Sequence, residues 1–175
     1  LSQLGLMFGQ NSLKENNKYE MLLTDEADLA GLPQMIKDAA AAKAKAKSKE
    51  GWMFDLSAPS YIAFMKYSSR RDLREKLYMA YTTQCAAGGE FDNRENVKQI
   101  AQTRLEIAKL LGYPDYATYG LRNKMAKDKE HVYGLLDDLF KAYAVAARED
   151  VKMVEGFAVG MEGKVIELMP WDWSY

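Results

Sequence analysis

The chain has 175 residues, of which 48% are hydrophobic and 28% charged, and its formal net charge is −1. This composition is typical of one globular domain or one lobe of a larger protein, and the balanced charge gives no general attraction to nucleic acid or anionic lipid. No window approaches the roughly 18–20 apolar residues of a membrane span, and no signal peptide is visible. We therefore expect no nucleic-acid partner, no membrane partner and a cytoplasmic location.

The counts of cysteine and histidine limit the possible chemistry. The one cysteine, Cys85, cannot form an internal disulfide, which fits a reducing compartment. Catalytic zinc sites usually take three protein ligands from His, Glu, Asp and Cys, and the one histidine, His131, is far from Cys85 in the sequence. No Walker A loop, Ser/His/Asp set, C-x-x-C or H-E-x-x-H motif occurs. We therefore assign no catalytic and no metal-binding residue, leave the substrate-binding residues unknown, and interpret His131 as a surface or interface residue and Cys85 as a small packing residue.

The first half of the chain begins in a helical pattern and then predicts two short strands and two helices. Residues 19–23 ("YEMLL") and 52–56 ("WMFDL") concentrate bulky apolar side chains and could pair into a small ribbon. Between them, Pro33 suits the first turn of a helix. Because the second half of that helix is alanine and lysine, we expect it to be exposed and not a core element. Ser69 is the predicted N-cap of the next helix, "SSRRDLREKLYMAYTTQ".

The second half of the chain predicts two long helices. Over 92–111, Asp92 and Glu95 have the spacing of a capping box, and Gly112 suits the left-handed position after the helix. The other helix covers 128–158, and its apolar stripe consists of Val132, Leu135, Leu136, Leu139, Phe140, Tyr143, Ala147, Val151, Val154 and Ala158. Since the apolar stripe of each of the two helices, 92–111 and 128–158, needs a partner, we expect the two helices to pack together. The fold class is therefore mainly α, a multi-helix lobe over 1–175 with a small two-stranded β ribbon as an option.

Three groups of side chains have both a structural and a functional interpretation. The first group is a cluster of three carboxylates, Asp25, Glu26 and Asp28. Such a cluster could perform acid–base chemistry or bind a metal ion, but it more often stabilises the start of a helix. The basic run at 43–49 could contact an anion, but a solvated helix face is the usual explanation. The three tyrosines Tyr113, Tyr116 and Tyr119 could line a cleft or be buried between helices, and these alternatives stay open.

The chain ends on an aromatic segment, "ELMPWDWSY". Free C-termini are usually polar and mobile, whereas aromatic side chains belong in cores and interfaces. We therefore expect Trp171, Trp173 and Tyr175 to behave as an interface, and we expect the chain to be a piece of a longer protein. Asp172 can accept a hydrogen bond from a backbone amide or an arginine and thereby fix the turn after Pro170.

Four blocks in order carry a family resemblance: "LLTDEADLAGLP", "APSYIAFMKYSSRRDLREKLYMAY", "LLGYPDYATYGLRNKMA" and "ELMPWDWSY". They resemble the segment that precedes the catalytic region in zinc oligopeptidases of the thimet oligopeptidase family, and are most similar to the peptidyl-dipeptidase and oligopeptidase A branch. The resemblance covers nearly the whole chain. One departure is Thr83-Gln84, because family members often have Thr-Arg there.

This resemblance implies a nearly all-helical fold of two lobes beside a deep channel, with zinc on its floor and short peptides as substrates. In that family the H-E-x-x-H helix and a third zinc-binding glutamate come later in the chain, so no ligand is carried onto a residue here. The segment would supply scaffold and channel wall, and its partner would be the remainder of the same polypeptide. The alternative is a free-standing helical binding module without catalysis. Reading the gene beyond Tyr175 distinguishes the two.

Overall fold

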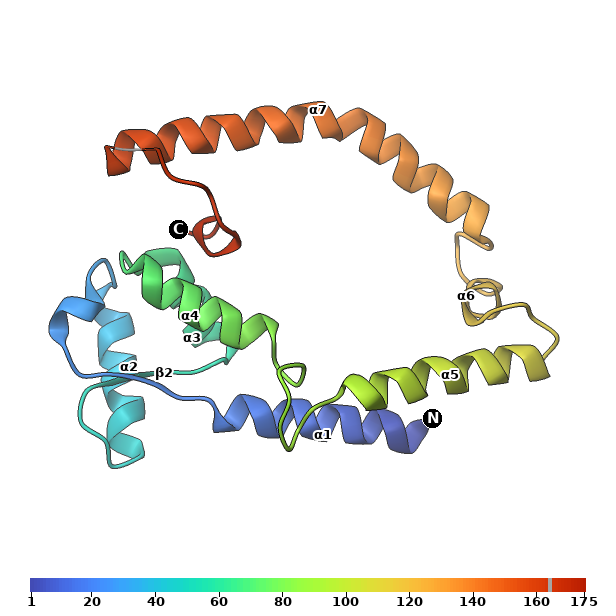
Figure 1. Cartoon of the computed structure of the whole chain (residues 1–175), viewed down its shortest axis with the longest axis horizontal. Helices are drawn as coiled ribbons and strands as arrows, with labels where there is room; N and C mark the ends of the chain where they lie inside the picture. The colour runs from blue at the N-terminus through green and yellow to red at the C-terminus, as the bar shows by residue number, and fades with distance from the viewer. Residues whose placement is uncertain (164) are drawn as a thin grey trace. The chain divides into compact units, whose positions relative to one another are not determined.

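The computed structural model describes residues 1–163 and 165–175, and its elements are mainly helices (Figure 1). In chain order they are α1 (Ser2–Lys18), β1 (Met21–Leu23), the 3₁₀ helix η1 (Glu26–Leu29), α2 (Gln34–Ala46), β2 (Trp52–Phe54), α3 (Ala58–Tyr67), α4 (Arg71–Thr82), α5 (Arg94–Leu110), α6 (Tyr116–Leu121), α7 (Lys129–Glu162) and the 3₁₀ helix η2 (Pro170–Asp172). The predicted mainly α fold with a small two-stranded ribbon is confirmed.

The chain forms two compact units. One contains residues 2–97 together with 169–175, and the other contains residues 98–168 with Leu1. The polypeptide therefore leaves the first unit within α5 and returns to it at Met169. That residues 1–175 make one lobe of a longer protein stays a prediction.

The ribbon supplies one side of the core of the first unit. Strands β1 and β2 pair antiparallel, with Met21 opposite Phe54 and Leu23 opposite Trp52. Met21 and Leu23 point inward and are buried, while Leu22 between them is exposed, as the two-residue period of a strand requires. The Phe54 ring lies edge-on to a phenylalanine of α3, and the buried core comprises Met21, Leu23, Leu29, Leu32, Ala40, Phe54, Leu56, Phe64 and Leu77.

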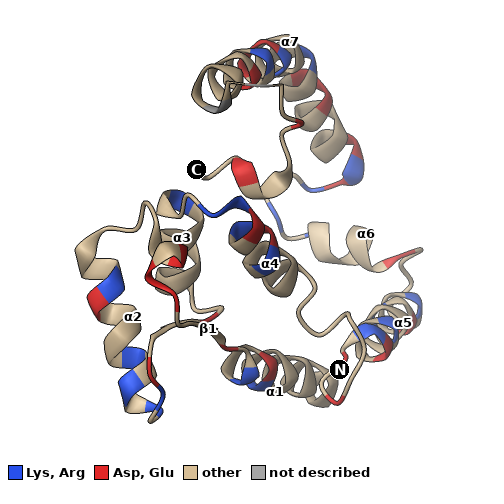
Figure 2. Cartoon of the chain, turned by 60° about the vertical axis from the view of Figure 1, so that its left-hand side comes forward, with Lys and Arg blue, Asp and Glu red and all other residues tan. Residues whose placement is uncertain are grey.

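Helix α2 packs on the ribbon, and the prediction that it stays outside the core is wrong. Ala40 and Ala44 are 4% and 0% exposed, and α2 lies against β2. Alanine contributes little apolar area, but its small side chain lets the helix backbone approach the strands closely. The helix is thus amphipathic, with an alanine face inward and lysines toward solvent; Figure 2 shows these lysines along α2.

The start of α4 differs from the prediction by one residue. Arg70, and not Ser69, occupies the N-cap position, and it makes no side-chain capping bond. The Arg70 amide instead donates to Ser68 Oγ at 3.3 Å. Because Ser68 is 0% exposed, this bond fixes the corner between α3 and α4.

Local chemistry sets the ends of the long helices. Asp128 accepts from the His131 amide at 2.9 Å, so the predicted start of α7 is confirmed. Gly112 has φ +81°, and the three amides after α5 donate to carbonyls of its last turn, so the predicted left-handed end is also confirmed. At the other end of α5, Asp92 accepts from the Arg94 amide at 2.8 Å, one residue earlier than a capping box would place the bond.

The apolar stripe of α7 is exposed, and the prediction that it packs against α5 is wrong. Within the described residues α7 packs chiefly on α6. A helix of 34 residues is about 51 Å long, so the six residues of α6 can cover only a small part of it. The large apolar side chains left at least 37% exposed are Tyr133, Leu135, Leu136, Leu139, Phe140, Tyr143, Val145, Val151, Met153, Phe157 and Met161.

Gly31 is required where the loop after η1 meets the corner between α3 and α4. Its φ is +83°, and a Cβ there would lie 2.3 Å from the Tyr67 carbonyl oxygen and 2.5 Å from Ser69 Oγ. We expect Gly31→Ala to lower the free energy of unfolding by about 2–4 kcal/mol, from left-handed backbone strain plus overpacking. Gly88→Ala is the control, because Gly88 has φ +89° but its Cβ would have no neighbour closer than 3.9 Å. Urea unfolding of both variants measures the difference, and equal losses would contradict the steric argument.

Candidate functional site

Residues 169–175, here called the strap, lie against the start of α4. The polar contacts between the strap and Arg74 of α4 are buried. Arg74 of α4 is 3% exposed. Its Nη2 donates to Asp172 Oδ1 at 2.9 Å, its Nη1 to the Ser68 carbonyl at 2.6 Å and its Nε to the Trp171 carbonyl at 3.2 Å. One guanidinium therefore joins the strap to the corner between α3 and α4.

Asp172 is the centre of the strap. Its side chain is 6% exposed and also accepts from Arg71 Nη2 at 2.7 Å and from the Met169 amide at 3.0 Å. The predicted bonds to a backbone amide and to arginine are therefore both confirmed. Burial alone would raise the pKa of Asp172, but the hydrogen bonds from Arg71, Met169 and Arg74 outweigh it and hold the pKa below its ordinary value.

The aromatic side chains of the strap differ in burial. Trp171 is 8% exposed and its ring centre lies 5.9 Å from that of Tyr78. The Tyr175 ring lies 4.1 Å from the Arg74 guanidinium carbon, although Tyr175 and Trp173 remain 48% and 51% exposed. Trp171 thus folds back onto α4 as expected of an interface residue, whereas Trp173 and Tyr175 keep about half of their surface free.

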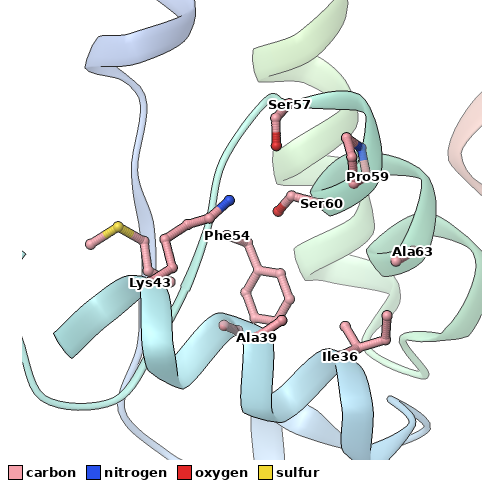
Figure 3. A pocket seen from close by; sticks show the side chains of 10 residues that line it. Ile36, Ala39, Lys43, Phe54, Ser57, Pro59, Ser60 and Ala63 are labelled. Atoms are coloured by element: carbon pink, nitrogen blue, oxygen red, sulfur yellow. The ribbon is translucent and has the colours of Figure 1, made fainter. Parts of the chain in front are cut away.

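A pocket of about 270 Å³ lies between α2, β2 and α3. Ile36, Ala39 and Lys43 project into it from α2, Pro59, Ser60 and Ala63 from α3, and the Phe54 ring lies between them (Figure 3). Most of its lining is apolar, with polar side chains that include Lys43 and Ser60, so the pocket suits a largely apolar group.

Three of the four lysines of the basic run, Lys43, Lys47 and Lys49, are paired with carboxylates. At the mouth of the pocket, Lys43 Nζ lies 2.7 Å from Asp55 Oδ2. Lys47 and Lys49 both bind the Glu20 carboxylate, and Lys47 Nζ does so at 2.6 Å. Their hydrogen bonds lower the pKa of Glu20. These contacts favour the structural interpretation of residues 43–49.

The three carboxylates of the first block serve the local fold. Asp25 accepts from the Ala27 amide at 2.9 Å and caps η1. Asp28 forms an ion pair with Arg70 of the next helix corner. Glu26 lies in the exposed first turn of η1. The helix-start interpretation is thus supported for Asp25, whereas Asp28 makes a tertiary contact with a residue 42 positions away.

The tyrosines lie in the unit of residues 98–168 and stack on one another. Tyr119 has ring-centre distances of 5.3 Å to Tyr113 and 5.7 Å to Tyr116. The Arg122 guanidinium covers the Tyr119 ring at 3.8 Å. Tyr116 lines a pocket of about 450 Å³ between α6 and α7. This position favours the cleft interpretation for Tyr116, while Tyr113 and Tyr119 are half-buried against their aromatic neighbours.

The remaining candidate residues, His131, Cys85 and Gln84, do not contact the strap in any bond described above. His131 is exposed in the first turn of α7, with Nδ1 2.6 Å from Asp128 Oδ1, and its surface position is confirmed. Cys85 is buried, which raises the pKa of its thiol, and it packs as expected. The side-chain nitrogen of the neighbouring Gln84, where the family often has arginine, is buried without a partner among the described residues. Over residues 1–163 and 165–175, no three His, Cys, Asp or Glu side chains are grouped to hold a metal ion.

Sequence reasoning missed Arg71 and Arg74 as the partners of Asp172. Their spacing of three residues places both on one face of α4, and this spacing could have indicated that the two arginines share one carboxylate partner. It also missed the pocket at Phe54, because α2 was expected to be exposed.

Comparisons with known proteins relate the chain to peptidases. Residues 64–175 match the profile of Peptidase family M3. The chain is 37% identical to Oligopeptidase A of Salmonella typhimurium over 179 aligned residues, 34% identical to a "Probable cytosolic oligopeptidase A" of Arabidopsis thaliana over 183, and 25% identical to Dipeptidyl carboxypeptidase of Escherichia coli over 169. These alignments cover 100%, 100% and 96% of the chain but 26%, 26% and 25% of the relatives. The chain thus spans about a quarter of the length of the curated relatives it matches.

Among the helices of the described ranges, none combines the length and the apolar character needed to cross a bilayer.

Proposed function

Because this chain belongs to peptidase family M3, of the oligopeptidase A type, we propose that it is a segment of a zinc-dependent oligopeptidase that hydrolyses short peptides. The observation that carries the proposal is the family match over 64–175, which includes α4, α7 and the strap. The names of the relatives, oligopeptidase A and dipeptidyl carboxypeptidase, support peptide bonds as the target. Release of dipeptides and internal cleavage are both compatible with these names.

Within such an enzyme, this segment supplies scaffold and channel wall, and its partner is the remainder of the same polypeptide. The exposed face of α7 supports that assignment. Monomeric proteins rarely leave a contiguous apolar patch larger than a few hundred Å², and α7 exposes apolar side chains from Tyr133 to Met161. Charged residues recur along the same helix, as Figure 2 shows. A helix of this kind is built to be covered along one side.

The described residues do not fit a catalytic zinc ion. Such an ion usually takes three protein ligands, and the one histidine is exposed and bound to Asp128. We therefore assign the zinc ligands of the proposed enzyme to other parts of its polypeptide, and derive no catalytic step from this segment. A cytoplasmic location is part of the proposal, supported by the single cysteine.

A free-standing helical binding module is the second candidate, and the same face of α7 favours it. An exposed apolar stripe can receive the amphipathic helix of another protein as well as a later part of the same chain. The two candidates differ in what the gene encodes beyond Tyr175. The peptidase requires an H-E-x-x-H helix there, and the binding module does not.

We expect the 175-residue protein to retain no stoichiometric zinc after dialysis and to cleave no fluorogenic peptide, because its one histidine cannot complete a zinc site. The product of a gene extended beyond Tyr175 is expected to cleave the same peptide and to lose activity on addition of a chelator. Chelator-sensitive turnover by the 175 residues alone would contradict the assignment of zinc to another part. An extended, zinc-loaded product that cleaves no peptide would contradict the function itself.

A further inference from the structure

We propose that the start of α4 is a docking site for a Trp-Asp segment, and that the strap of residues 169–175 occupies it as a detachable element of the fold. The basis of this proposal is the contact set of Arg71, Arg74 and Tyr78 with Trp171 and Asp172.

The site on α4 is preorganised. The Arg74 guanidinium is held by the Ser68 carbonyl at 2.6 Å, a contact that does not involve the strap. Arg71 lies one helical turn earlier on the same face. The two guanidinium groups therefore converge on one carboxylate, and charge-assisted bonds of this kind are the stronger and more directional class of hydrogen bond.

The strap supplies a matching pair of side chains. Asp172 places one oxygen toward Arg74 and the other toward Arg71, at 2.9 and 2.7 Å. The preceding Trp171 packs beside Tyr78 and presents its carbonyl to Arg74 Nε. The Met169 amide closes the turn on Asp172 Oδ2, so the segment carries its own folded conformation. The site on α4 thus recognises a tryptophan ring and its carbonyl together with the carboxylate of the aspartate that follows it.

The strap is separable from the core of its unit. The buried core around the ribbon and α3 contains no residue of the strap, whose main contacts are with α4. Its release therefore removes contacts with α4 and leaves the buried cluster of the ribbon and α3 in place.

A labelled peptide in trans tests this proposal. The probe is a fluorescein-labelled peptide with the sequence of residues 168–175, LMPWDWSY, added to the 175-residue protein. In the wild type the strap occupies the site at high effective concentration, so the probe is excluded. Asp172→Ala weakens the strap, and we expect the probe to bind this variant at least about tenfold more tightly than the wild type, since the probe restores the buried ion pair. Arg74→Met in the same variant is expected to abolish the gain.

Amide hydrogen exchange provides the second measurement. In the wild type the amides of Met169 and Asp172 should exchange at least about tenfold faster than those of Met21 and Leu23 in the ribbon, because a detachable segment opens locally while the rest of its domain stays intact. Equal protection of strap and ribbon amides would overturn the proposal, since the strap would then open only together with the core. Absence of probe binding to Asp172→Ala, or binding that survives Arg74→Met, would also overturn it.

Discussion

Replacing Arg74 by methionine is expected to lower the free energy of unfolding by about 3–5 kcal/mol, the usual cost of removing one partner of a buried ion pair. Methionine keeps much of the volume of the arginine stem but none of its donors. The Asp172 carboxylate would keep Arg71 as a partner, while the buried carbonyls of Ser68 and Trp171 would lose theirs. Most of the loss therefore comes from polar groups left buried and unpaired.

Arg70→Met is the matched control. Arg70 forms ion pairs with Asp28 and Asp72, but its side chain is 38% exposed. Exposed pairs contribute about 0–1 kcal/mol, so this variant should be nearly as stable as the wild type. Urea unfolding followed by circular dichroism compares the two variants. Similar losses for Arg70→Met and Arg74→Met would contradict the role given to burial.

The pH dependence of stability adds an independent check on the same ion pair. Because the pKa of Asp172 is lowered in the folded protein, its contribution is present above the unfolded value of about 3.9 and is lost as the pH falls through the folded value. The difference in stability between wild type and Asp172→Asn should therefore be constant near neutral pH and shrink below about pH 3.9. A difference that does not change with acidification would mean that the carboxylate charge is not what holds the strap.

Trp171→Ala should also cost about 3–5 kcal/mol, because it removes a buried ring and leaves a cavity beside Tyr78. Two control variants test the reason. Trp171→Phe keeps an aromatic ring and removes the indole N–H, which is buried without a hydrogen-bond partner among the described residues; it should cost clearly less than alanine. Trp173→Ala should have a small effect, since Trp173 is 51% exposed.

The same unfolding measurement decides the outcome for the tryptophans. Equal destabilisation by Trp171→Ala and Trp173→Ala would mean that burial in this structure does not govern their contributions. The double variant Arg74→Met, Trp171→Ala should lose less than the sum of the single variants, because both substitutions detach the same strap and the second has little left to remove.

The sequence by itself determined the features that depend on neighbouring residues. Asp128 and Gly112 mark helix ends because a capping carboxylate and a left-handed glycine act within one turn of the chain. Bulky apolar runs predicted the two strands that pair as β1 and β2. Ordered blocks of sequence were also sufficient to place the chain in its family.

The tertiary structure decided what depends on residues far apart. The bond between Arg74 and Asp172 joins positions 98 residues apart, so no local pattern could choose this arginine over the others. Burial of Ala40 and Ala44 depends on how closely the ribbon approaches α2. The small size of alanine permits a close approach, but the presence of alanine in the sequence does not predict one. The stripe of α7 shows the same limit, because an apolar period predicts that a face is suited to being covered but does not identify the surface that covers it.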